Sequence, residues 1–259
     1  MGGNSQVMTL SVRNILPWVL LLCLIGCKED PSLTFESWEH NSKAPNVSVK
    51  IPIAKGLEPL AQNINTALRE TLIATLDFEE ETQTDSIADA ILSFQKVYND
   101  FRGDHPSLSA EWEAEMEAQV NFTNKNLISI RLETYMYTGG AHGLGTVEFL
   151  NFDKLTGEPL ENWEFFDDME GFERLAEKKF RIQEHIPPNG NINTTGFMFE
   201  DDHFHLPENI GLTKKGLLLL YNPYEIASYA DGSISLTIPW DEVQTYLIRK
   251  LKTNDQSVN

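Results

Sequence analysis

Cysteine is scarce in this sequence, and both cysteines lie near its beginning. The 259 residues contain two, Cys23 and Cys27. A chain cut before Cys27 would keep that one alone, so we expect no disulfide in the mature domain. Long hydrophobic runs are also missing. The apolar run Ile15–Ile25 has about eleven residues, whereas a helix that spans a bilayer needs roughly 20.

Positive charge is scarce as well. Lys and Arg number 20 against 39 Asp and Glu, which gives a net charge of −19. Loss of Arg13 with the N-terminal segment would leave about −20, from 19 bases and 39 acids. Such a surface repels nucleic acid and anionic lipid. It favours a cationic partner, or simply solubility, and charge alone does not separate these two.

The N-terminal segment has the layout of a secretory signal peptide, with Arg13 before the apolar run and a small residue, Gly26, at the cut. Leu24-Ile25-Gly26-Cys27 resembles the lipobox of bacterial lipoproteins, in which the cysteine is lipidated and becomes the first mature residue. We therefore expect a signal peptide over 1–26 and a lipidated Cys27 with a polar tether over 27–45. An ordinary signal peptide with an incidental cysteine is the alternative.

The residues after Cys27 bear on location. Lys28-Glu29-Asp30 is similar to the export signal that places lipoproteins on the outer surface in the Bacteroidetes group, although a solvated linker explains these residues nearly as well. We expect a protein of the bacterial cell envelope that contacts the membrane through its lipid anchor alone, with the outer-membrane surface as a candidate place.

Hydrophobic periodicity predicts a strand, two helices and then three strands in the first part of the fold. Alternation from Val47 to Ile53 predicts a strand, and apolar stripes predict helices over Leu57–Leu76 and Ile87–Phe101, the second capped by Thr84 or Asp85. Alternating residues then predict a hairpin and a further strand, over Met116–Phe122, Leu127–Tyr137 and Thr146–Phe152.

The second part repeats this mixture. A helix is expected to open at Asp167-Asp168, and strands are expected over Gly216–Tyr221 and Ser233–Ile238. A last helix from Trp240 would carry Val243, Tyr246, Leu247 and Leu251. Hairpin strands with segregated helices indicate an α+β fold, with antiparallel sheets and helices packed on one face. We expect two closely linked subdomains, 46–133 and 134–252, and a tail over 253–259.

Two separated motifs carry a resemblance to a known family. They are YMYTGGAHGLGTVEFLNFDKLTGEPL, from residue 135, and GLTKKGLLLLYNPYEIASYADGSISLTIPWDEV, from residue 211. Together they resemble an extracytoplasmic domain family of unknown function. That family forms the extracellular part of anti-sigma-V factors, and a similar region precedes the catalytic domain in some peptidoglycan deacetylases. Residues 46–133 look like the segment that usually comes before it.

The resemblance implies a binding function. In anti-sigma-V factors the domain binds lysozyme, so we expect a non-catalytic module that holds a cationic protein such as lysozyme, or peptidoglycan. The matched region includes neither a cytoplasmic sigma-binding segment nor a deacetylase domain, so we do not expect signalling or sugar chemistry to carry over. The sequence shows no nucleotide-binding or clustered metal motif, and we expect no cofactor.

The loop YTGGAHG is the first candidate site. Gly139 and Gly140 permit positive φ or a close backbone approach, which a reversing chain needs. His142 could be a base, a metal ligand or a support for the loop. Because neither a serine, a cysteine nor a carboxylate is adjacent, we expect ligand contact or loop support instead of catalysis. Tyr137, at the start of the loop, is a further candidate for ligand binding.

Two further groups are candidates. On a strand, His203 and His205 would share a face, and with His142 or His185 they could bind zinc, which makes a metal-dependent envelope hydrolase the alternative function. Surface histidines are the simpler reading. In Tyr221-Asn222-Pro223-Tyr224 the proline ends a strand, and both tyrosines suit either an interface or a buried corner. We expect a corner that packs against the glycine loop.

Overall fold

A computed structural model describes residues 2–3, 32–78, 84–105 and 110–248. The described fold belongs to one compact unit, Pro31–Asn259. Cys27, the predicted tail 253–259 and Leu251 lie outside the described residues, as does the predicted signal peptide apart from residues 2–3. In the described part of the chain, the structure contains no helix with the length and apolar character needed to cross a membrane.

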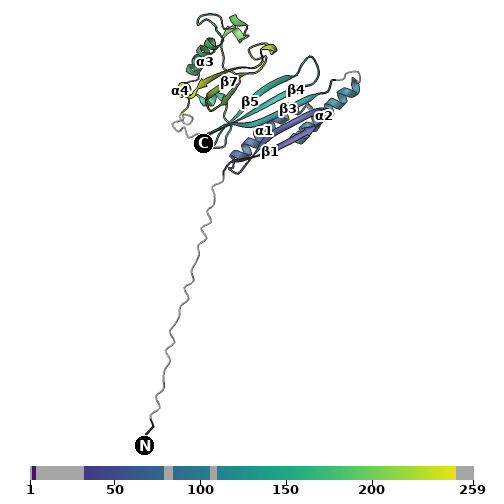
Figure 1. The fold of residues 1–259 in the computed structure, drawn as a ribbon, viewed down its shortest axis with the longest axis vertical. Coiled ribbons are helices and arrows are strands. Elements are labelled where there is room, and N and C mark those ends of the chain that lie inside the picture. Colours follow the sequence, from purple (N-terminus) through teal and green to yellow (C-terminus); the bar gives the residue numbers. More distant parts are fainter. Residues whose placement is uncertain (1, 4–31, 79–83, 106–109, 249–259) are drawn as a thin grey trace. The chain divides into compact units, whose positions relative to one another are not determined.

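Five strands form the larger sheet, in the same order as in the sequence (Figure 1). They are β1 Thr34–Ser42, β2 Asn46–Lys55, β3 Glu113–Thr123, β4 Leu127–Tyr137 and β5 Leu144–Asp153. Neighbours are antiparallel except β2 and β3, which are parallel. A parallel pair needs a long connection, and two helices provide it, α1 Leu60–Leu76 and α2 Ile87–Asp104.

The predicted periodicity of this part is confirmed, because the stripe of α1 and the inward residues of the sheet share one core. α2 packs on the same side, and its cap is Ser86, whose hydroxyl accepts a hydrogen bond from the Asp89 amide, instead of Thr84 or Asp85. The principal buried side chains of this core are Val49, Ile51, Ile64, Leu68, Leu72, Phe94, Ile130 and Leu132.

The expected tether over 27–45 is wrong in part, because some of these residues form the strand β1. Residues Thr34–Ser42 pair with β2 along their whole length, so the fold begins before Asn46. β1 lies at the edge of the sheet, and its residues alternate between exposed and half-buried, with none fully buried. An edge strand of this kind leaves a weak apolar signal, which is why its composition is similar to that of a linker.

The second part of the fold has a smaller antiparallel sheet. Its strands are β6 Asn209–Leu212, β7 Gly216–Tyr221 and β8 Ile234–Pro239. The helix α3, Met169–Gln183, begins after Asp168, whose carboxylate accepts from the Gly171 amide, as predicted for the Asp167-Asp168 pair. Short 3-10 helices occupy Asn162–Phe165, Ile192–Thr195, Glu200–Asp202 and Tyr229–Asp231.

One prediction in this part was wrong, and one strand was missed. The last helix, α4, covers Trp240–Val243 and then ends. Its expected continuation includes Leu247, which instead forms a β-bridge with Phe166. The four-residue strand β6 was not predicted, because it is short and contains Gly211. The α+β class itself is confirmed, with α1 and α2 on one face of the large sheet and a second core around Phe172, Phe180 and Tyr221.

The smaller sheet packs against the larger one through polar bonds at one end. The amides of Asn151 and Asn121 donate to the carbonyls of Ile210 and Leu212, at 2.9 and 2.6 Å. The predicted boundary between residues 133 and 134 falls inside β4, which pairs with β3 and β5 as one strand. The first subdomain therefore extends through β5, and the YTGGAHG loop belongs to it.

Candidate functional site

The YTGGAHG loop joins β4 to β5 at the end of the large sheet. Gly139 and Gly140 have φ of 99° and 100°, a conformation that favours glycine. The Tyr137 hydroxyl donates to the Gly140 carbonyl at 3.1 Å. The glycines are therefore required by the chain reversal, and Tyr137 braces it.

His142 contacts two tyrosines from the second subdomain. Its ring stacks on Tyr229, with centroids 3.8 Å apart and planes inclined by 16°. Its Nε2 lies 3.5 Å from the Tyr224 hydroxyl, and the rings of Tyr224 and Tyr229 are 5.7 Å apart. We call His142, Tyr224 and Tyr229 the aromatic cluster. His142 and Tyr224 are exposed and Tyr229 is half-buried, so the cluster can contact a ligand.

The corner that carries Tyr224 is fixed to β5 by Asn222. Its Oδ1 accepts from the Val147 amide at 2.8 Å, and its Nδ2 donates to the Val147 carbonyl at 2.9 Å. Glu225 closes the turn by accepting from the backbone amides of Asn222 and Glu208. Burial raises the pKa of Glu225. The expected packing of the corner on the loop is thus present for Tyr224.

Tyr221 does not belong to this surface. Its side chain is 0% exposed, and its hydroxyl donates to the His205 carbonyl at 2.6 Å. Burial, with the nearby carboxylates of Glu225 and Glu173, raises the pKa of its phenol. Adjacent strand positions face opposite ways, and Tyr221, the last residue of β7, points into the core. The prediction that Tyr221 binds a ligand is therefore corrected, because its side chain is part of the core.

Sequence reasoning missed two tyrosines near the loop. One is Tyr229, although it lies in the second quoted motif. The other is Tyr135, whose ring covers Gly143 so closely that a Cβ there would lie 2.5 Å from the ring. The repeated aromatic and glycine residues of the two motifs were the available signal, but their pairing depends on the tertiary fold.

An acidic surface lies beside the loop, on the face of the large sheet opposite α1 and α2. Glu113, Glu115 and Glu117 alternate along β3, and Glu133 of β4 lies opposite Glu117. We call these four residues the acidic face. A hollow of about 500 Å³ is bordered by Glu115, Glu117, Glu133 and Tyr135. Two bases lie here, Lys50 at 3.3 Å from Glu117 and Arg131 paired with Glu133.

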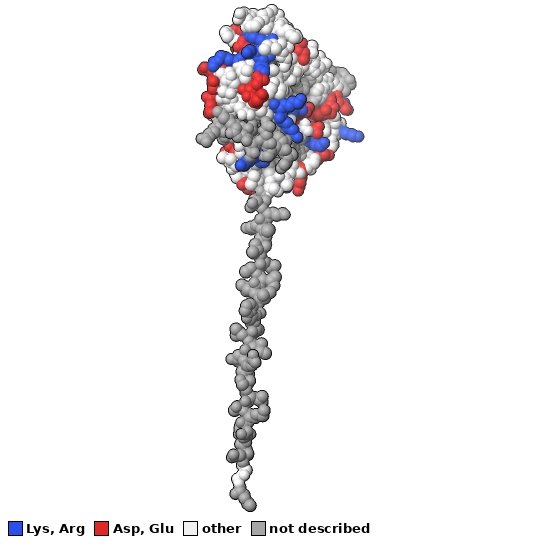
Figure 2. All heavy atoms as spheres, turned by 60° about the vertical axis from the view of Figure 1, so that its left-hand side comes forward, with Lys and Arg blue, Asp and Glu red and all other residues white. Residues whose placement is uncertain are grey.

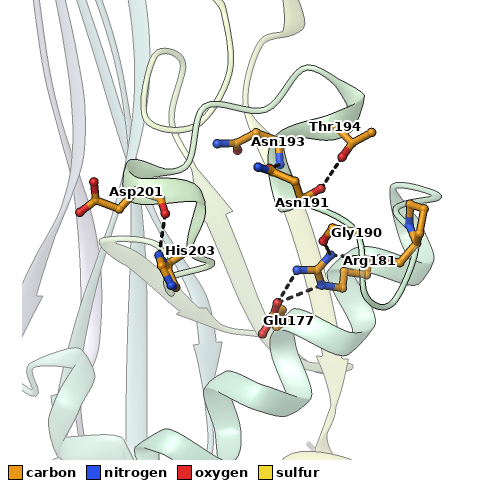
Figure 3. Close-up of polar contacts among 9 residues, drawn as sticks. Glu177, Arg181, Gly190, Asn191, Asn193, Thr194, Asp201 and His203 are labelled. Atoms are coloured by element: carbon orange, nitrogen blue, oxygen red, sulfur yellow. Dashed lines mark hydrogen bonds and ion pairs between the residues drawn. The ribbon is translucent and has the colours of Figure 1, made fainter.

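Both signs of charge occur on the face that Figure 2 shows. There, Lys and Arg side chains lie interspersed with Asp and Glu. The ion pairs of α3 follow this pattern, with Arg181 bound to Glu177 at 2.7 Å and Lys179 to Glu242. Figure 3 shows Arg181 between Glu177 and the Gly190 carbonyl. Arg181 therefore holds the loop after α3 in place.

The three histidines of the alternative hydrolase contact separate backbone groups. His203 and His205 follow the 3-10 helix Glu200–Asp202 and are not on a strand. The Nδ1 of His203 lies 2.6 Å from the Asp201 carbonyl (Figure 3), and that of His205 lies 3.0 Å from the Leu206 carbonyl. Among the described residues, no three His, Cys, Asp or Glu side chains form a group suited to a metal ion.

Two family models match the chain, which confirms the family resemblance. Residues 164–241 match the model described as a protein of unknown function (DUF3298), and residues 38–145 match the model described as deacetylase PdaC. The first match contains Tyr224 and Tyr229, and the second contains His142. The search of curated proteins gave no match.

Solved structures of the DUF3298 family share the fold. A member from Bacteroides fragilis is 22% identical, with a TM-score of 0.64, over 85% of this chain and 96% of that chain. A DUF3298 family protein from Pseudomonas aeruginosa is 21% identical, with a TM-score of 0.60, over 85% of this chain and 95% of that chain. At these identities the likeness establishes the α+β architecture.

Proposed function

We propose, from the pairing of a PdaC-like segment with a DUF3298-like segment, that this protein is a non-catalytic binding module of the bacterial cell envelope. Its partner is a cationic protein such as lysozyme, with peptidoglycan as the other envelope ligand to test. Lipid on Cys27 anchors it. One matching family model is described as a deacetylase, and we assign no sugar chemistry to the matched segment.

The acidic face beside the aromatic cluster is the observation that carries this proposal. The four glutamates on these two adjacent strands outnumber the two basic side chains near them. Three of them, Glu115, Glu117 and Glu133, are exposed. A surface of one sign attracts a partner of the opposite sign and raises the rate of encounter at low salt. The hollow among these residues gives a basic side chain a place to enter.

The aromatic cluster supplies the second kind of contact. Exposed tyrosines offer large apolar surfaces with polar tips, and such residues are enriched where binding energy is concentrated. Tyr224 is 57% exposed, and its backbone is fixed by the Asn222 turn. A preformed aromatic rim next to an acidic hollow suits a folded cationic protein, because little ordering is needed on binding.

The test is a titration of purified residues 28–259 with lysozyme at low and moderate salt. We expect binding that weakens as salt increases, and a several-fold weaker affinity for Glu115→Lys. Glu70→Lys is the matched control, because Glu70 is exposed on α1, on the other side of the sheet. No binding at either salt concentration contradicts the lysozyme form of the proposal.

Two further measurements test the other parts of the proposal. Co-sedimentation with insoluble peptidoglycan tests the other ligand, with Glu70→Lys and Glu115→Lys compared again. Anchoring is tested by metabolic labelling with a fatty acid, which Cys27→Ser should abolish. Label that persists in Cys27→Ser contradicts a lipid anchor at that residue.

A further inference from the structure

A second hollow lies along the outer edge of β5, away from the acidic face. Its volume is about 420 Å³. We call it the edge cavity. Most of its lining comes from β5, from the chain around residues 159–162 and from residues 208–209 at the start of β6, and Ala67 of α1 and Asn222 complete it. The residues that matter most are Glu148, Phe149, Glu161, Asn162, Glu208 and Asn222.

The backbone of Phe149 faces this cavity. β5 is the last strand of its sheet, and other segments form hydrogen bonds with its outer edge at two residues, Val147 and Asn151. Asn222 bonds both the amide and the carbonyl of Val147, and the Leu160 amide donates to the Asn151 carbonyl at 2.8 Å. Because backbone groups two residues apart point the same way, the amide and carbonyl of Phe149 point outward between these closures.

Among the described residues, none forms a hydrogen bond with the outward amide or carbonyl of Phe149. One backbone donor and one backbone acceptor therefore remain for another chain. Exposed strand edges are pairing sites for extended peptides. The closures on either side limit such pairing to about one residue of a partner. The wall also contains Asn151, which is 3% exposed, and whose Oδ1 has no hydrogen-bond partner among the described residues.

The charge of the edge cavity is negative. Glu148, Glu161 and Glu208 line it, and its described lining contains no Lys, Arg or His. Partial burial raises the pKa of Glu148. It also raises the pKa of Glu225, which accepts a hydrogen bond from the Glu208 amide at 3.0 Å. Carboxylates in such surroundings are stabilised when a cation enters.

We propose that the edge cavity receives a lysine or arginine side chain from a polypeptide partner, while the partner backbone pairs with Phe149. An ammonium group has three donors and a guanidinium five, which suits carboxylates on three segments around one opening. The inference deepens the proposed function and rests on it, because it adds a second point at which a cationic protein is held. It assigns the backbone contact to Phe149 and the charge contact to Glu148, Glu161 and Glu208.

The test uses nuclear magnetic resonance on ¹⁵N-labelled residues 28–259. The probe is the blocked peptide acetyl-Val-Lys-Val-amide, and the matched control peptide has glutamine in place of lysine. We expect the lysine peptide to shift the Phe149 amide resonance in a saturable way, with an affinity at least threefold above that of the control peptide. Equal shifts with both peptides, or shifts that avoid Phe149, overturn the proposal.

Variants and a sugar probe sharpen this test. Glu148→Gln combined with Glu161→Gln should lower the affinity for the lysine peptide at least threefold, whereas Glu184→Gln, at the residue after α3 and outside the cavity lining, should leave it unchanged. A glucosamine dimer carries the same ammonium group on a glycan. If it shifts the Phe149 amide resonance more strongly than the lysine peptide does, the cavity binds an amino sugar and the polypeptide assignment is overturned.

The two proposals can fail separately. If lysozyme binds and Glu115→Lys weakens it, while the cavity variants change neither lysozyme binding nor the Phe149 resonance, the proposed function stands and the edge-cavity inference falls. If lysozyme does not bind while the lysine peptide shifts Phe149, the cavity assignment stands and lysozyme is the wrong partner.

Discussion

The ring of His142 lies face to face with the ring of Tyr229, at a centroid distance of 3.8 Å. His142 comes from the loop between β4 and β5, and Tyr229 comes from the connection between β7 and β8. Each residue falls within a different family match. The contact therefore joins the two halves of the fold at the rim of the acidic face, and it fixes the loop relative to the tyrosine corner.

Loss of this stacking should weaken the loop without unfolding the protein. His142→Ala removes an exposed ring pair worth about 0.5–1.5 kcal/mol, so we expect a decrease of about that size in the free energy of unfolding measured with urea. Lysozyme binding should fall as well. Tyr229→Phe is the control, because it keeps the ring. Equal destabilisation by Tyr229→Phe would show that the hydroxyl, and not the stacking, is responsible.

Asn222 should be more important to stability than its position in a loop suggests. Asn222→Ala leaves both the amide and the carbonyl of Val147 without the partners that now bond them at 2.8 and 2.9 Å. Unsatisfied groups that are partly buried cost about 1–3 kcal/mol each at most, so we expect a loss of roughly 1–3 kcal/mol in thermal or urea unfolding. Asn189→Ala, at an exposed residue, is the control. If Asn222→Ala lowers stability no more than Asn189→Ala does, the two hydrogen bonds between Asn222 and Val147 do not stabilise the fold.

Much of the fold could be predicted from the sequence, because buried faces leave a period. The stripes of α1 and α2 and the alternation of β2 and β3 are confirmed as predicted, and β4 and β5 are strands as predicted. β1 was missed because none of the side chains of this edge strand is fully buried, so its alternation leaves only a weak apolar signal. α4 was predicted too long because Leu247 is buried through a bridge to Phe166 and not through a helix face. A local sequence pattern therefore indicates that a residue is buried, but not whether a helix, a strand or an isolated bridge buries it.

The candidate site was predicted in part. The position of His142 in a glycine loop and the presence of a tyrosine corner follow from the motifs. The stacking on Tyr229 does not, since it is set by how the two sheets pack. The acidic face was not predicted either, because the β3–β4 turn separates Glu133 from Glu113, Glu115 and Glu117. Their common face follows from the register Glu117 to Glu133, which sequence alone does not state.

Tyr221 should make the protein sensitive to alkaline pH. The pKa of its buried phenol is raised in the folded state, whereas the unfolded pKa is about 10. The neutral form is favoured in the fold, so its contribution to stability is complete below pH 10 and is lost as pH increases above 10. Unfolding measured from pH 8 to 11 should show stability falling less steeply in Tyr221→Phe than in the unsubstituted protein.

The same variant tests the structural role of the hydroxyl. Tyr221→Phe leaves the His205 carbonyl without its 2.6 Å donor, so we expect a loss of about 1–2 kcal/mol at pH 7, with lysozyme binding unchanged. Tyr224→Phe is the matched control at an exposed tyrosine. A binding defect in Tyr221→Phe without a loss of stability would return Tyr221 to the ligand-binding surface.

Gly211 should be the most sensitive glycine at the joint between the sheets. A Cβ there would lie 2.5 Å from the ring of Phe149. Phe149 is 8% exposed, so the ring has little room to move. Overpacking of this kind costs about 1–3 kcal/mol, and we expect Gly211→Ala to lower stability by that amount. Gly103→Ala, where a Cβ meets nothing within 4 Å, is the control and should be near neutral.

A second substitution identifies the cause of that loss. Phe149→Leu shortens the side chain that the new Cβ would meet, so the double variant Gly211→Ala with Phe149→Leu should be more stable than the sum of the single losses predicts. Neighbours in contact show such non-additivity, typically of about 0.5–3 kcal/mol. Strictly additive losses would mean that the Gly211 backbone, and not its approach to Phe149, sets the packing between the two sheets.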